Sequence, residues 1–307
     1  MKSLKLIIAG LDYAGKTSSI IALREKYNFY EKVENLKPTV KIEYSSFNFL
    51  NQWEVNIWDM GGQEKYRQIY LDKPEYFADT NYFYYYIDIQ DEKKISESIN
   101  YFEELLTILK DFNYSNKIII CFHKYDPKLR RNKDILERIT SVKKKLKQNE
   151  HFEFKFFRTS IFDISTLSKA ISYSLNSLID FSVLKLILKG LIRKFNGNYA
   201  ILYTDSGVIL VDFYKEILDS IEYEEKVRQS INRDLVLIQK LKDDNVEFNE
   251  RVDYDEEIKY LKKYEIGDNI FFLKMNAPKM REEKIQLLKN NFQNFENDLQ
   301  EIFSNNS

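Results

Sequence analysis

The chain has 307 residues, of which only 8 are glycine and 4 are proline, whereas 44% are hydrophobic and 31% are charged. So little glycine and proline excludes a collagenous or linker-like chain, and the apolar content excludes intrinsic disorder over most of the length. The formal net charge is only −1, so nucleic acid is not an expected partner.

The first 180 residues alternate between apolar runs typical of strands and segments with helical periodicity. The expected strands are residues 5–9, 40–50, 54–58, 82–89, 117–122 and 152–158, and the expected helices are 16–27, 74–77, 93–110, 134–148 and 167–181. This alternation predicts an α/β fold with a mostly parallel sheet flanked by helices. Ligands of such sheets bind at the carboxyl ends of the strands.

The loop after the first expected strand matches the phosphate-loop pattern G-x-x-x-x-G-K-[ST] from Gly10 to Thr17. Backbone N–H groups of such a loop cradle phosphates at a helix N-terminus. Lys16 can reach the β- and γ-phosphates, and the hydroxyl of Thr17 can bind Mg²⁺. The residues expected to contact a nucleotide here are Asp12, Tyr13, Ala14, Gly15, Lys16, Thr17 and Ser18.

A second motif, Trp58-Asp59-Met60-Gly61-Gly62-Gln63, comes at the end of the strand expected at 54–58. Asp59 at this strand end can hold the Mg²⁺ shell. Gly62 can present an unhindered N–H to a γ-phosphate, because any Cβ there would clash.

A third motif, Phe122-His123-Lys124-Tyr125-Asp126, follows the strand expected at 117–122. GTPases use N-K-x-D at this place. The carboxylate of Asp126 can accept both N–H donors on the guanine edge, and the stem of Lys124 can pack over the base. Adenine has no such donor pair, so the motif favours GTP over ATP. His123 replaces the usual Asn, and its imidazole can still bridge to the phosphate loop.

On these motifs, residues 4–181 resemble the small GTPases of the extended Ras superfamily. The phosphate loop is similar to that of the Arf family, and the second motif is similar to the W-D-x-G-G-Q of both Arf and Rag-type GTPases. His123 in the third motif resembles the Rag type. So does Phe157-Arg158-Thr159-Ser160-Ile161-Phe162-Asp163, which is similar to the Rag segment F-R-T-S-I-W-D.

The resemblance implies a switch that cycles between GTP and GDP, with Mg²⁺ as cofactor. It makes Thr39 in the first switch a further ligand of Mg²⁺, beside Thr17 and Asp59. It gives Gln63 the task of orienting the attacking water, and it places Ser160 and Ile161 over the guanine.

No arginine in this segment resembles an arginine finger. Arg67 is expected to be an exposed residue of the switch helix, and Asp12 would add a carboxylate near the γ-phosphate. Slow intrinsic hydrolysis is therefore expected, with a GTPase-activating partner supplying a further factor of about 10³ to 10⁵.

Residues 182–307 are too many for a tail, so a second domain is expected after a GTPase domain at 1–181. The predicted order is a helix at 181–195, strands at 199–203 and 208–213, a helix at 215–241, strands at 246–248, 257–260 and 269–275, and a helix at 279–303. This α+β order resembles the roadblock, longin-like domain of Rag-type GTPases. It implies a homodimer, or a heterodimer with a related GTPase, and recruitment of an effector or scaffold protein.

The lone Cys121 lies in an apolar run and fits a reducing compartment. No run approaches the roughly 18 apolar residues of a membrane span, and neither a secretory signal nor a lipidation motif is recognised. A cytoplasmic protein without a direct lipid anchor is expected, reaching membranes only through partners. Three alternatives stay open: an Arf-like trafficking GTPase with an unrelated second domain, a non-hydrolysing GTP-bound scaffold, and a P-loop kinase or ATPase.

Overall fold

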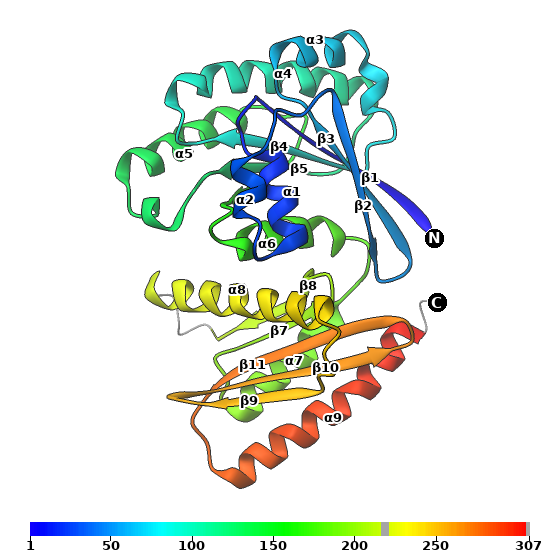
Figure 1. The fold of residues 1–307 in the computed structure, drawn as a ribbon, viewed down its shortest axis with the longest axis vertical. Helices are drawn as coiled ribbons and strands as arrows, with labels where there is room; N and C mark the ends of the chain where they lie inside the picture. Colours follow the sequence, from blue (N-terminus) through cyan, green and yellow to red (C-terminus); the bar gives the residue numbers. More distant parts are fainter. Residues whose placement is uncertain (216–220, 305–307) are drawn as a thin grey trace. The chain divides into compact units, whose positions relative to one another are not determined.

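The computed structural model describes residues 1–215 and 221–304. It divides into two compact units, Met1–Ala170 and Ile171–Ser307, each with its own sheet (Figure 1). The division falls inside a helix, earlier along the chain than the boundary expected after residue 181. That boundary between functional domains stays a prediction.

The first unit contains a six-stranded sheet in the order β2-β3-β1-β4-β5-β6. Its strands are β1 (Lys2–Gly10), β2 (Ile42–Phe49), β3 (Trp53–Met60), β4 (Tyr82–Asp88), β5 (Ile118–His123) and β6 (Phe154–Arg158). All neighbouring pairs are parallel except β2 with β3. The mostly parallel α/β fold predicted from the sequence is therefore confirmed.

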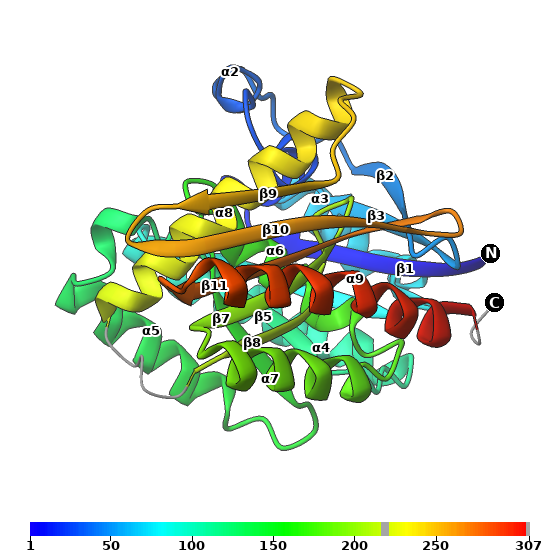
Figure 2. The same cartoon turned by 90° about the horizontal axis from the view of Figure 1, so that it is seen from below.

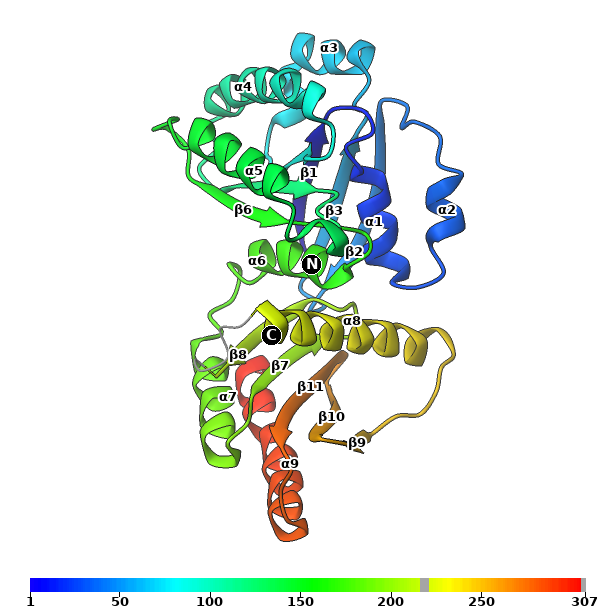
Figure 3. The same cartoon turned by 90° about the vertical axis from the view of Figure 1, so that its left-hand side faces the viewer.

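Helices cover both faces of this sheet, with α4 and α5 on one side and α1 on the other (Figure 3). The helices are α1 (Lys16–Glu25), α2 (Tyr30–Glu34), α3 (Glu64–Asp72), α4 (Ile95–Asp111), α5 (Lys133–Leu146) and α6 (Ile164–Leu175). Short 3₁₀ helices follow at η1 (Pro74–Phe77), η2 (Glu92–Lys94) and η3 (Pro127–Leu129). The sequence did not predict α2 as a helix, and α6 ends before the expected residue 181.

Strand β4 is buried on both faces, as expected for the middle of a parallel sheet. Its tyrosines keep their hydroxyl groups hydrogen-bonded inside the core. Tyr85 donates to the carbonyl oxygen of Ser98 at 2.6 Å, and Tyr84 donates to that of Ala170 at 3.1 Å. Buried phenol groups thus contribute apolar area without an unpaired polar atom, which lets an aromatic run serve as a central strand.

The second unit contains a five-stranded antiparallel sheet in the order β8-β7-β11-β10-β9. Its strands are β7 (Tyr199–Thr204), β8 (Ile209–Tyr214), β9 (Glu250–Tyr254), β10 (Glu257–Ile266) and β11 (Asn269–Pro278), and its helices are α7 (Ser182–Phe195), α8 (Ile221–Asp243) and α9 (Glu282–Ser304). Helices α7 and α9 pack side by side on one face (Figure 2). On the opposite face, Ser230 and Asp234 of α8 bond to Tyr199 and Lys274 of the sheet.

One expectation for this unit needs correction. The strand expected at 246–248 is wrong, because the edge strand β9 begins at Glu250. Its positions are all exposed or half-buried, so its apolar pattern is weak. The helix expected at 215–241 corresponds to α8; its expected first turn, at residues 216–220, lies outside the described part, as does the chain end at 305–307.

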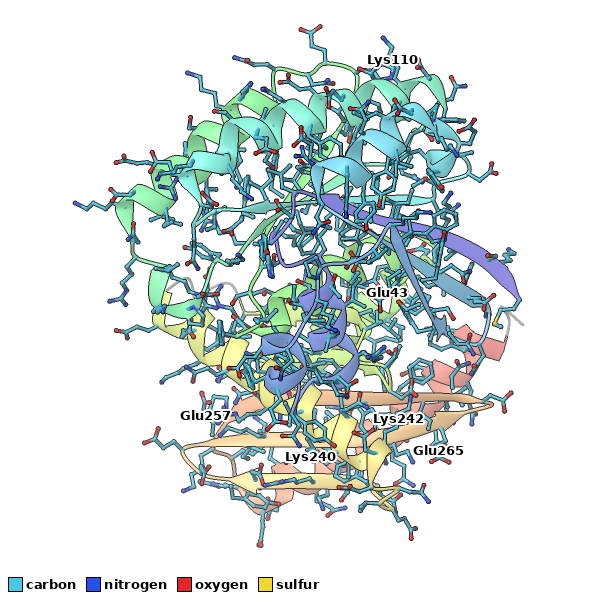
Figure 4. The ribbon with its side chains drawn as sticks, turned by 45° about the horizontal axis from the view of Figure 1, so that its top comes forward. Glu43, Lys110, Lys240, Lys242, Glu257 and Glu265 are labelled. Atoms are coloured by element: carbon cyan, nitrogen blue, oxygen red, sulfur yellow. The ribbon has the colours of Figure 1, made fainter. Side chains whose placement is uncertain are left out.

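Charged side chains of both signs project from this unit, among them Lys240 and Lys242 of α8 and Glu265 of β10 (Figure 4). Within residues 1–215 and 221–304, no helix is both long and apolar enough to span a membrane.

Candidate functional site

The carboxyl ends of β1, β3, β4 and β5 meet at one cavity of about 490 Å³. Most of the site residues predicted from the sequence line it: Asp12, Tyr13, Gly15, Lys16, Thr17, Ser18, Thr39, Gly62, Gln63, His123, Lys124, Asp126 and Ile161. Three others are buried beside it: Ala14 in the phosphate loop, Asp59 near the end of β3, and Ser160 in the segment after β6. The structure therefore brings the whole predicted set together.

The phosphate loop turns into α1 at Gly15, whose φ of 84° lies in the left-handed region that favours glycine. A Cβ at Gly15 would also lie 2.4 Å from the imidazole of His123. The ammonium group of Lys16 donates to the carbonyl oxygens of Gly10, at 3.0 Å, and Leu11, at 2.8 Å. Burial lowers the pKa of Lys16 to about 8, although the charges of Asp59 and Asp12 oppose this shift.

The loop between β3 and α3 closes directly onto the phosphate loop. The backbone N–H of Asp12 donates to the carbonyl oxygen of Gly62 at 3.0 Å, and a Cβ on Gly62 would lie 2.2 Å from that nitrogen. No side chain fits at Gly62 in this arrangement. Gln63 is the residue that precedes α3, and it faces the cavity.

Three side-chain oxygens from different elements converge beside the phosphate loop. The hydroxyl groups of Thr17 and Thr39 are 2.9 Å apart, and Thr17 also hydrogen-bonds to Oδ2 of Asp59. Among the described residues, the buried Oδ1 of Asp59 has no hydrogen-bond partner. Burial raises the pKa of Asp59 to about 6, and Glu43, opposite it in the β2–β3 register, adds to that shift.

This oxygen cluster fits Mg²⁺, which binds through one or two carboxylates together with substrate phosphates. An unpartnered carboxylate oxygen next to two hydroxyl groups provides such a site. Over the same described ranges, no group of three or more His, Cys, Asp or Glu side chains could hold a metal. One carboxylate with two hydroxyl groups fits a site completed by a phosphorylated ligand.

Where the loops after β4 and β5 line the cavity, two neighbouring side chains orient the carboxylate of Asp126. Ser160 Oγ donates to its Oδ1 at 2.6 Å, and Gln90 Nε2 donates to its Oδ2 at 3.0 Å. Lys124 is held by an ion pair with Asp88, with 2.6 Å between Nζ and Oδ2. The carboxylate therefore faces the cavity with both oxygens already in contact with donors.

His123, the last residue of β5, is buried and contacts two other parts of the site. Its Nδ1 lies 2.9 Å from the hydroxyl of Thr159, and its Nε2 lies 3.3 Å from that of Ser19 in α1. Burial, aided by the neighbouring Lys124 charge, lowers the pKa of His123 to about 3. The neutral imidazole thus bridges Thr159, directly after β6, to α1, the helix that begins in the phosphate loop.

Sequence reasoning missed Gln90, which also lines the cavity. It follows the end of β4 by two residues, so the general rule about strand ends could have pointed to it.

The expectation that Arg67 is an exposed residue is wrong. It lies in α3, but its side chain is only 13% exposed, because it pairs with Glu97 of α4 at 2.5 Å and packs over the ring of Tyr101.

A mostly parallel sheet with a phosphate loop between its central strand and the next helix defines the P-loop fold, which GTPases share with kinases and ATPases. The chain belongs to the Gtr1/RagA G protein family, whose conserved region matches residues 5–231. The Rag-type resemblance predicted from the sequence is confirmed at the level of the family.

Two curated relatives illustrate the match. The chain is 28% identical over 182 residues to GTP-binding protein GTR1 of Saccharomyces cerevisiae, covering 57% of this chain and 57% of that protein. It is 25% identical over 205 residues to Ras-related GTP-binding protein B of Rattus norvegicus, covering 64% of this chain and 53% of that protein. The chain thus spans about half the length of these relatives.

Among solved structures, the Arl6 BBS3 small GTPase of Trypanosoma brucei, with the bound nucleotide analogue GppNp, is similar with a TM-score of 0.45 and 16% identity. This similarity covers 57% of this chain and 97% of that one.

Proposed function

We propose that the protein is a Mg²⁺-dependent switch that binds GTP and GDP and hydrolyses GTP. One observation carries this proposal: a single cavity joins a phosphate loop to a carboxylate, Asp126, that is oriented by Ser160 and Gln90. The loop suits phosphates, and the carboxylate suits the paired N–H donors of guanine. Membership of the Gtr1/RagA family supports the same function.

The residues have separate tasks in this proposal. Lys16 exchanges its hydrogen bonds with loop carbonyls for contacts to the β- and γ-phosphates. Thr17, Thr39 and Asp59 hold Mg²⁺, which neutralises charge on the phosphates when it is bound. The γ-phosphate draws Thr39 and the backbone of Gly62 inward, and its loss on hydrolysis releases both segments.

Hydrolysis is proposed to be slow without a partner. Gln63 faces the cavity and orients the attacking water, but no arginine is found among the described cavity-lining residues. Arg67 forms an ion pair with Glu97, so it could act as an arginine finger only if that ion pair broke. A GTPase-activating protein would therefore complete the site.

Single-turnover hydrolysis of bound GTP tests this proposal. The wild-type rate should fall within about 10⁻⁴ to 10⁻² s⁻¹, and Gln63→Leu should lower it at least about tenfold. Gln68→Leu, on an exposed position of the same helix, is the matched control and should leave the rate unchanged. Fast hydrolysis by the isolated wild type, or GTP that persists uncleaved with candidate activators, would contradict it; the latter result would favour a GTP-bound scaffold.

We further propose that the second unit is a roadblock-type dimerisation domain. Its element order, one helix, a hairpin, a helix, three strands and a helix, supports this assignment. The partners would be a second copy or a related GTPase, an activating protein, and an effector or scaffold. In this proposal the protein works in the cytoplasm and does not bind nucleic acid.

A further inference from the structure

An acidic side chain in the phosphate loop creates an electrostatic problem for a GTP site. Asp12 lines the cavity, and its backbone N–H bonds to Gly62, next to Gln63. In the proposed function, which this inference deepens, the γ-phosphate lies toward these switch residues. The carboxylate of Asp12 would repel that phosphate, and it would repel GTP more than GDP because only GTP carries the additional charge.

The structure supplies a counter-charge for this carboxylate. Nζ of Lys94 lies 2.8 Å from Oδ1 of Asp12, so the two form a direct ion pair. Lys94 is the last residue of η2, which leads into α4, and the pair joins segments that are 82 residues apart in sequence. The same ammonium group lies 5.7 Å from the ring centre of Tyr13, the next residue of the loop.

Ion pairs this exposed contribute little to folding, because water screens them and ordering the side chains costs entropy. The side chains of Lys94 and Asp12 are 37% and 30% exposed. This ion pair can affect ligand binding instead, because Asp12 lines the cavity. The charge of Asp12 already acts on Lys16, whose pKa it helps to raise against the effect of burial. A change in the charge of Asp12 therefore changes the electrostatic potential at Lys16, inside the site.

We propose that Lys94 is a positioning residue that neutralises Asp12 and holds its carboxylate toward η2, so that the phosphate loop accepts GTP as well as GDP. Lys94 acts through Asp12 and does not contact the nucleotide. The affinity ratio between GTP and GDP is consequently set in part by a lysine outside the three nucleotide-binding motifs.

Displacement of fluorescent GDP by unlabelled GDP and by a non-hydrolysable GTP analogue, in the presence of Mg²⁺, measures this ratio on the full chain. Lys94→Met keeps the length of the side chain and removes its charge. This substitution should lower the affinity for the GTP analogue, relative to the affinity for GDP, by about fivefold, which is the upper range for a partly exposed charge pair. Lys94→Arg should keep the wild-type ratio, and Lys93→Met, on the exposed neighbour in η2, is the matched control.

The double variant distinguishes a charge effect from a structural one. Once Asp12→Asn has removed the carboxylate, Lys94→Met should no longer change the ratio. A wild-type ratio in Lys94→Met, a loss that persists in the Asp12→Asn background, or a failure of Lys94→Arg to preserve the ratio would overturn the inference. A wild-type protein that binds neither nucleotide would instead overturn the proposed function.

Discussion

His123 stands where most GTPases have asparagine, and its burial decides its chemistry. The imidazole lies within hydrogen-bond distance of Thr159 on one side and Ser19 of α1 on the other. The sequence suggested a bridge to the phosphate loop, and Ser19 lies just beyond that loop. Because burial lowers its pKa to about 3, the ring stays neutral over the physiological range.

This shift predicts a pH dependence of stability. As the pH falls through about 6.5, His123 takes up a proton in the unfolded chain but not in the folded one, so the free energy of unfolding decreases until the pH approaches 3. Between about pH 7.5 and about pH 5 the loss from this residue is about 2 kcal/mol. His123→Asn should remove that part of the pH dependence in urea unfolding.

The exposed His151 provides the control for this measurement. His151→Asn should leave the difference between the two pH values as it is in the wild type. An unchanged difference in His123→Asn would show that the buried imidazole is not the source of the effect.

Residues with fixed spacing in a motif could be predicted from the sequence, whereas their supporting neighbours could not. Lys16 and Asp126 belong to patterns whose chemistry requires those residue types. Gln90 was missed because its loop has no fixed pattern, and only the fold brings its amide to Asp126. Arg67 was misjudged because the packing of α3 on α4, which buries it, is a tertiary contact.

At the scale of elements, length and periodicity explain which parts the sequence could predict. Helix α4 has 17 residues with a continuous apolar face, and the central strands are almost entirely apolar. Helix α2 has only 5 residues, none of them buried, so it carries no amphipathic signal. Strand β9 lies at a sheet edge, where alternation is weak.

Helix α7 contains Gly190 at an exposed position, and a Cβ there would meet no atom within 4 Å. A glycine inside a helix costs conformational entropy relative to alanine. Gly190→Ala should therefore raise the free energy of unfolding by about 0.5–1 kcal/mol. Chemical denaturation of the full chain measures this change; a lower value would mean that this position is not an exposed helix site in solution.

At the scale of the whole molecule, the length and the two periodic patterns predict two units, and the structure contains two separately packed sheets. The way the units work together does not follow from either sheet alone. The proposed dimer is therefore the expectation to test on the intact protein.

Light scattering on the purified full chain should give twice the 36.9 kDa mass of one chain if it forms a homodimer. A heterodimer, formed on mixing with a related GTPase, should instead give the sum of the two chain masses. The dimer should be present with GDP and with a GTP analogue, since the proposed interface lies in the second unit. A monomer under all these conditions would contradict the dimerisation proposal and favour an Arf-like GTPase with an unrelated second domain.

The central claim is that Asp126 selects guanine. Asp126→Asn replaces an acceptor pair by one acceptor and one donor, which matches the edge of xanthine instead. Displacement of fluorescent GDP by GDP, ADP and XDP measures the preference, with Asp111→Asn, at the end of α4, as the control.

Wild-type protein should bind GDP far more tightly than ADP. Asp126→Asn should lose about 10- to 100-fold in GDP affinity, as expected when hydrogen bonds to a charged group are lost, and should gain affinity for XDP. Equal binding of GDP and ADP by the wild type, or unchanged GDP affinity in Asp126→Asn, would contradict the account.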